Sequence, residues 1–88
     1  MIDRNRTLKT LEVANIVLNK KNIRCAEDIF RKTPFSLTLA YGTLDKLEEY
    51  GLIRREKVGR TKKIIVTDKG RKFGNHIKQI LKILKEDD

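Results

Sequence analysis

Positive charge is concentrated between residues 54 and 63, where six of ten side chains are basic and Glu56 alone is acidic. Basic side chains on a protruding segment can contact nucleic-acid phosphates and gain affinity from the counterions that they release. Arg60 is the candidate for insertion into a narrow minor groove. The alternative is a solvated edge strand whose charges prevent aggregation. The residues expected to contact DNA in this segment are Arg54, Arg55, Lys57, Arg60, Thr61, Lys62 and Lys63.

A second set of candidate contacts lies on a helix expected over residues 36–50. Its apolar stripe, Ala40, Leu44 and Leu47, is spaced four and three residues apart and should face the core. The N-terminal part of a recognition helix reads base edges, so the residues before and opposite this stripe are the candidates. They are Ser36, Thr38, Tyr41, Gly42 and Lys46.

Three residues of this helix need separate interpretations. Gly42 lowers helix propensity by about 1 kcal/mol, and on the surface it would let the backbone approach DNA closely. Asp45 repels phosphate, and we expect it to pair within the chain, with Lys46 or Arg54, although it could also accept a hydrogen bond from a cytosine amino group. Tyr41 either contacts DNA or packs against Phe35.

Length and composition limit the class of protein. The 88 residues suffice for one domain, 1–88, with a thin core. Twenty-one Lys and Arg against twelve Asp and Glu leave a formal net charge of +9, which favours an acidic partner such as a nucleic acid. No apolar run approaches the roughly 20 residues that span a bilayer. We therefore expect an intracellular protein with no membrane contact.

The residues that could support catalysis or metal binding are sparse. The sequence has one histidine, His76, and one cysteine, Cys25, and no Gly-rich phosphate loop or nucleophile–base set is evident. Cys25 is interpreted as a small buried apolar residue, with redox sensing or a bridge between subunits as the alternative. We expect no catalytic residue, no metal site and no cofactor.

The local signals predict the order helix, helix, helix, hairpin, helix. Thr7 is the expected N-cap of the first helix, Pro34 ends the second and Ser36 caps the third. Gly51 ends the third helix and Gly59 marks the hairpin turn. The predicted ranges are an N-terminal arm over 1–6, helices over 7–21, 26–32 and 36–50, a hairpin over 52–66 and a last helix over 68–85.

Two short motifs resemble those of MarR- and PadR-like regulators. The run LDKLEEYGLIRR at 44–55 is similar to their recognition-helix end and first wing strand, and VTDKG at 66–70 is similar to their entry to the helix after the wing. The resemblance extends from about residue 7 to 84, and also to very short winged-helix proteins of archaea and their viruses. It implies an α+β winged helix-turn-helix with three helices, a β-hairpin wing and a C-terminal dimerisation helix.

The spacing of apolar residues in the last helix predicts a dimer. Its apolar residues step four, three and four positions apart, a heptad-like seam, and part of it would be an exposed patch in a monomer. The alternative is that the seam packs wholly on the first helix of the same subunit. The expected interface residues are Phe73, Ile77, Ile80, Leu81 and Leu84.

The sequence thus predicts a transcription regulator that binds specific double-stranded DNA as a homodimer. The resemblance implies one recognition helix per subunit in successive major grooves, with the wings on the backbone or minor groove. So short a chain leaves little room beneath the dimer helices, so we expect no small-molecule effector. The alternatives are a non-specific architectural DNA-binding protein and a winged-helix module for protein interaction.

Overall fold

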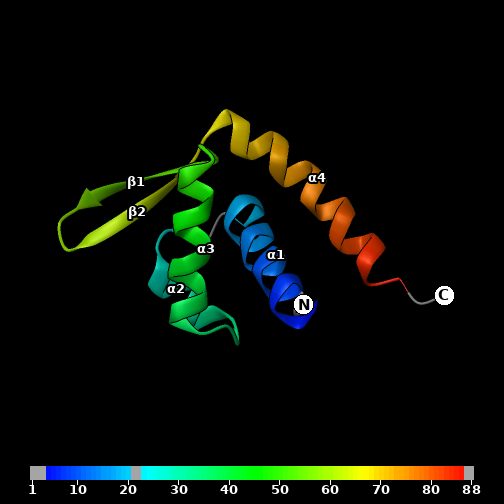
Figure 1. Cartoon of the computed structure of the whole chain (residues 1–88). Coiled ribbons are helices and arrows are strands. Elements are labelled where there is room, and N and C mark those ends of the chain that lie inside the picture. Colours follow the sequence, from blue (N-terminus) through cyan, green and yellow to red (C-terminus); the bar gives the residue numbers. More distant parts are fainter. Residues whose placement is uncertain (1–3, 21–22, 87–88) are drawn as a thin grey trace.

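The computed structural model describes residues 4–20 and 23–86. In order, these residues form α1 (Arg4–Asn19), α2 (Ala26–Lys32), α3 (Leu37–Glu49), β1 (Ile53–Val58), β2 (Thr61–Val66) and α4 (Asp68–Leu84). In Figure 1, α1 lies between α3 and α4, and the hairpin of β1 and β2 projects away from these helices. This arrangement confirms the predicted α+β winged helix-turn-helix fold. None of the described helices combines the length and apolar composition needed to span a membrane.

The core is built around α1. Val13 and Val17 are fully buried on α1 and belong to one apolar cluster with Ile29 of α2, Leu44 of α3 and Ile77 of α4. Residues three and four apart share one face of a helix, which explains how α1 buries both valines together. Because α2, α3 and α4 all contact α1, this one helix sets how the others are oriented.

The first helix begins earlier than predicted. Thr7, the expected N-cap, lies inside α1, and the arm predicted over residues 1–6 is helical from Arg4 onward. No proline or glycine stands between Arg4 and Thr7 to stop the helix. The predicted arm residues 1–3, and the predicted helix end at Lys21, lie outside the described residues.

The ends of α3 follow the predicted local signals. The Ser36 hydroxyl oxygen accepts a hydrogen bond from the Leu39 N–H at 3.1 Å and caps the helix. At the other end Gly51 adopts a φ of +75°, which glycine reaches at little cost. The Leu52 N–H then donates to the Leu47 carbonyl at 2.9 Å. The chain therefore leaves α3 in a fixed direction and enters β1.

The hairpin register determines which face each wing side chain occupies. Gly59, with a φ of +63°, forms the turn, and the antiparallel pairs run from Ile53 with Val66 to Val58 with Thr61. Directly paired residues lie on the same face of the sheet. One face therefore carries Arg55, Lys57 and Lys62 with the buried Ile64, and the other carries Arg54, Glu56 and Lys63.

The start of α4 is fixed against the end of α3. The Thr67 hydroxyl donates to the Gly51 carbonyl at 2.7 Å and accepts from the Gly70 N–H at 3.0 Å, so Thr67 is the N-cap. A Cβ at position 70 would collide with the Leu52 carbonyl oxygen, so only glycine permits this close approach. The wing and α4 therefore both depend on the turn at residues 51–52.

Candidate nucleic-acid interface

The outer face of α3 carries the predicted contacts. Ala40, Leu44 and Leu47 are buried, as their spacing predicted, and Thr43 is buried beside them. The predicted contact residues of this segment are all exposed, namely Ser36, Thr38, Tyr41, Gly42 and Lys46. A Cβ at Gly42 would meet no atom within 4 Å. The helix surface is therefore open at its middle turn.

Tyr41 is held in place from the neighbouring helix. Its hydroxyl donates to Glu27 Oε1 of α2 at 3.1 Å, while 41% of the residue stays exposed. This hydrogen bond raises the pKa of Tyr41. The Glu27 pKa is lowered, first by a hydrogen bond from its own backbone N–H, then by the Cys25 thiol and by Tyr41. This pair could not be predicted from the sequence, because it joins residues on two separate helices.

The wing presents five of its six predicted cations to solvent. Arg54 and Lys63 extend from one face of the hairpin, Lys57 and Lys62 from the other, and Arg60 lies at the turn. Thr61 is also exposed. These cations are free to reach phosphates.

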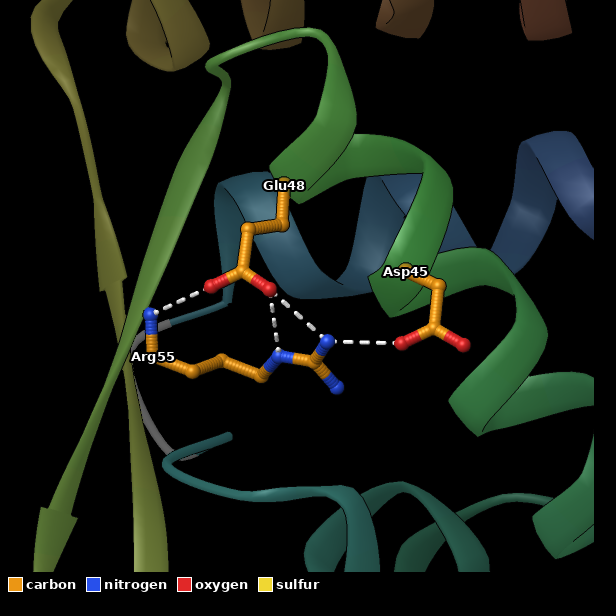
Figure 2. A network of polar contacts seen from close by, with 3 residues as sticks. All are labelled: Asp45, Glu48 and Arg55. Atoms are coloured by element: carbon orange, nitrogen blue, oxygen red, sulfur yellow. Dashed lines mark hydrogen bonds and ion pairs between the residues drawn. The ribbon is translucent and has the colours of Figure 1, made fainter.

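Arg55 occupies a different environment from the other five wing cations. Its guanidinium lies between β1 and α3 (Figure 2), and only 13% of the side chain is exposed. Nη2 donates to Glu48 Oε1 at 2.9 Å and to Asp45 Oδ1 at 2.6 Å. The Arg55 backbone N–H donates to Glu48 Oε2 at 3.1 Å. Arg55 therefore links the wing to α3.

This network corrects the prediction for Asp45. The expected intramolecular ion pair exists, but its partner is Arg55, not Lys46 or Arg54. The prediction missed Glu48, although it lies three residues after Asp45 and so on the same side of the helix. The hairpin alternation brings Arg55, and not Arg54, to the α3 side. The sequence alone left the register open, because Ile64, Ile65 and Val66 form a continuous apolar run.

The charges of the network support one another. The hydrogen bond from Arg55 lowers the pKa of Glu48 below its usual value. In turn the hydrogen bond to Glu48, followed by that to Asp45, raises the pKa of Arg55. One guanidinium therefore offsets part of the negative charge that Glu48 and Asp45 place on the outer face of α3.

A groove of about 390 Å³ separates α3 from the wing. Cations and carboxylates meet in it: Arg55, Arg60 and Lys62 from the hairpin, Glu27 from α2 and Asp45 from α3. Tyr41, Ala26 and Leu44 complete its lining. The predicted recognition helix α3 and the tip of the hairpin therefore border one concave surface.

The predicted dimer residues of α4 separate into two groups. Ile77 and Leu81 are buried within the chain. Phe73, Ile80 and Leu84 remain 42%, 45% and 56% exposed. Part of the apolar seam of α4 therefore packs in the core of the subunit, and the rest is exposed. The seam does not pack wholly within the subunit, which was one of the two alternatives.

The open space next to α4 is larger than we expected for so short a chain. An apolar groove of about 390 Å³ lies between α1, α3 and α4. Leu11, Leu47, Tyr50 and Phe73 are among its lining residues, and Lys46 and Lys69 also line it. Lys46, predicted to contact DNA, therefore also borders this groove at the end of α3.

Cys25 is free and buried before α2. Burial raises the pKa of its thiol, which disfavours the reactive thiolate. His76 is exposed on α4. Within residues 4–20 and 23–86, no three His, Cys, Asp or Glu side chains lie close enough together to hold a metal ion.

Comparisons with known proteins agree with this fold. The family model of the DUF6293 C-terminal winged helix domain matches residues 4–75. The chain is also similar to the crystal structure of AF1382 from Archaeoglobus fulgidus, with 28% sequence identity and a TM-score of 0.67. That similarity covers 98% of this chain and 94% of the archaeal one. No curated protein matches the chain.

The Arg55 network predicts a specific pH dependence of stability. A carboxylate whose folded pKa is lowered stabilises the fold above its unfolded pKa and loses this effect as pH falls through the folded pKa. We expect Arg55→Met to lower the free energy of unfolding at pH 7, because Glu48 loses its main partner. The difference from the wild type should shrink as pH falls below about 4.5, the ordinary Glu value.

Urea unfolding of both proteins at pH 7, 5 and 3 measures this difference. Glu48→Gln is the matched control, because it removes the titrating group itself, and its deficit should shrink over the same pH range. If the free energies of unfolding of Arg55→Met and the wild type differ by the same amount at pH 7, 5 and 3, Arg55 and Glu48 are not coupled.

Proposed function

The chain belongs to the DUF6293 C-terminal winged helix domain family, and we propose that it binds specific double-stranded DNA and regulates transcription as a homodimer. The observation that carries this proposal is the concave surface between α3 and the wing, with an exposed helix face on one side and exposed cations on the other. A major groove admits an α-helix, and the hairpin cations would then lie along the flanking backbone.

In this proposal the wing supplies most of the affinity and α3 reads the bases, as the types of residue on each indicate. α3 carries a single basic residue, Lys46, so most of the affinity comes from phosphate contacts of the wing. Ser36, Thr38 and Tyr41, at the N-terminal part of α3, are positioned to meet base edges. The open surface at Gly42 allows the helix to lie deep in the groove.

Arg55 has a supporting role in this proposal. Asp45 and Glu48 on the outer side of α3 would repel phosphate if they were unpaired. Their hydrogen bonds to Arg55 offset this repulsion and hold the wing at a set distance from the recognition helix. The remaining wing cations are left for DNA, with Arg60 at the tip as the minor-groove candidate.

The homodimer is supported by the open part of the α4 seam. Phe73, Ile80 and Leu84 lie along one flank of α4, with Phe73 beside the apolar groove at the start of the helix and Leu84 at its end. An isologous interface needs a patch that complements itself. A second copy running antiparallel would bring each Leu84 toward the groove beside the partner's Phe73.

Charge favours the same arrangement. The groove is bordered by Lys46 and Lys69, whereas the exposed Glu86 follows α4. Antiparallel copies of α4 would bring Glu86 of one subunit near these lysines of the other. We propose the docking mode of MarR- and PadR-like proteins for this dimer, with the two copies of α3 in successive major grooves of one duplex.

Substitution of two wing cations tests the DNA contact. We expect Arg60→Ala combined with Lys62→Ala to weaken binding to a duplex and to reduce the slope of log affinity against log salt by about 2, since each phosphate contact contributes about 0.9. Fluorescence anisotropy at several salt concentrations measures both quantities.

The matched control carries Lys72→Ala and Lys82→Ala. These two lysines of α4 are exposed and line neither the groove between α3 and the wing nor the apolar groove beside α4. It has the same net charge as the wing variant and should keep nearly the wild-type slope. An equal loss in both variants would mean that net charge alone governs binding and would contradict a DNA surface on the wing.

A single carboxylate on the α4 flank tests the dimer. We expect Ile80→Glu to convert the protein to a folded monomer, because Ile80 is 45% exposed within the subunit and would place an unpaired charge in the dimer interface. The neighbouring exposed Gln79→Glu is the control and should remain dimeric. Sedimentation equilibrium measures the mass, and a dimeric Ile80→Glu variant would rule out this interface.

A further inference from the structure

A third groove, of about 490 Å³, lies beside β2. The end of α1, the segment at residues 23–24, strand β2 and the start of α4 form its walls. Its lining residues are Val17, Leu18, Asn19, Lys20, Ile23, Arg24, Lys63, Ile64, Val66 and Arg71. Of the charged residues in this groove, only Lys63 was predicted from the sequence to contact DNA.

The charge of this groove has one sign. Four cations line it, namely Lys20, Arg24, Lys63 and Arg71, and no carboxylate does. Arg71 pairs with the exposed Asp68 at 2.8 Å. Among the described residues, Lys20, Arg24 and Lys63 form no ion pair. Like charges gathered in a concavity repel one another and raise the local potential for an anion.

The groove is also built on a fixed backbone. The Ile64 N–H of β2 donates to the Arg24 carbonyl at 2.7 Å, and the Arg24 N–H donates to Asp28 Oδ2 at 2.9 Å. The hydrogen bond from Arg24 lowers the pKa of Asp28, which keeps this acceptor ionised. Ile23 and Ile64 are buried beneath the cations. The Arg24 side chain is therefore free while its backbone is held on both sides.

This groove and the α3 groove share no lining residue. Lys63 pairs with Glu56 and lies on the hairpin face opposite to Arg55 and Lys62, which border the α3 groove. A duplex seated against α3 would have to bend around the wing to reach Lys20 and Arg24. Bending 20–30 base pairs by 40–90° costs roughly 1–6 kcal/mol, so a straight duplex on α3 leaves this groove open to a second one.

We propose that this groove binds the phosphate backbone of a second DNA duplex, so that each winged-helix domain can bridge two duplexes. The proposal rests on the proposed function, since the first duplex occupies α3 and the wing tip. Lys20, Arg24, Lys63 and Arg71 contact phosphates by charge, without reading sequence. Because both surfaces belong to one domain, a monomer also bridges.

The test uses two duplexes of about 20 base pairs, roughly two helical turns, one attached to beads and one fluorescent. We expect wild-type protein to retain the fluorescent duplex on the beads. Lys20→Glu combined with Arg24→Glu should reduce this retention at least about tenfold relative to Lys72→Glu with Lys82→Glu, which makes the same change in net charge. Both variants should bind a single duplex with affinities within about threefold of each other.

Two further variants sharpen the result. Arg71→Glu lies outside the wing and leaves the Arg24 backbone contacts untouched, and should reduce bridging even if the double variant folds poorly. The monomeric Ile80→Glu variant should still bridge. Bridging that is lost in Ile80→Glu but kept in the groove variants would assign it to the two α3 surfaces of a dimer and overturn the proposal.

The outcomes separate this inference from the proposed function. A wild-type protein that binds no duplex refutes both. A wild-type protein that binds one duplex but retains no second one refutes the groove alone. Weaker binding of the groove variants to a single long duplex, without any bridging, would mean that one DNA wraps around the wing, and would also overturn the second-duplex assignment.

Discussion

The guanidinium of Arg55 joins the two parts of this domain that must act together. It holds Glu48 and Asp45 of α3 from the base of the wing (Figure 2). Together with the turn at residues 51–52 and the hydrogen bond from Ile64 to Arg24, it fixes the angle of a two-stranded hairpin that has few buried residues. Without it, two carboxylates would stand unpaired on the outer face of α3. The charge on the outer face of α3 and the link between α3 and the wing both depend on this contact.

Shortage of core explains the surfaces that remain open. A chain of this length buries only about 60% of its unfolded surface, and α1 alone must pack against α2, α3 and α4. Ile77 and Leu81 complete that core, while Phe73, Ile80 and Leu84 have nothing left within the subunit to cover them. The exposed flank of α4 and the charged hairpin faces are therefore open, and they are the surfaces on which we propose that a second copy and DNA bind.

Local chemistry was predictable from the sequence, and long-range pairing was not. The Ser36 cap, the Gly51 stop and the Gly59 turn each depend on a few neighbouring residues, and all three lie where they were predicted. The partner of Asp45 depended on the hairpin register, which a continuous apolar run left open. The two-sided burial of α4 and the groove at Arg24 arise only when distant segments pack together.

The central claim is that α3 and the wing read specific DNA as a pair of subunits. Selection from a random pool of duplexes at several salt concentrations, with sequencing of the retained fraction, tests it most directly. The account predicts enrichment of an inverted repeat whose half-sites lie about one helical turn apart. Tight retention without enrichment would contradict specific reading and favour an architectural role, and no retention at low salt would contradict DNA binding and favour a protein-interaction module.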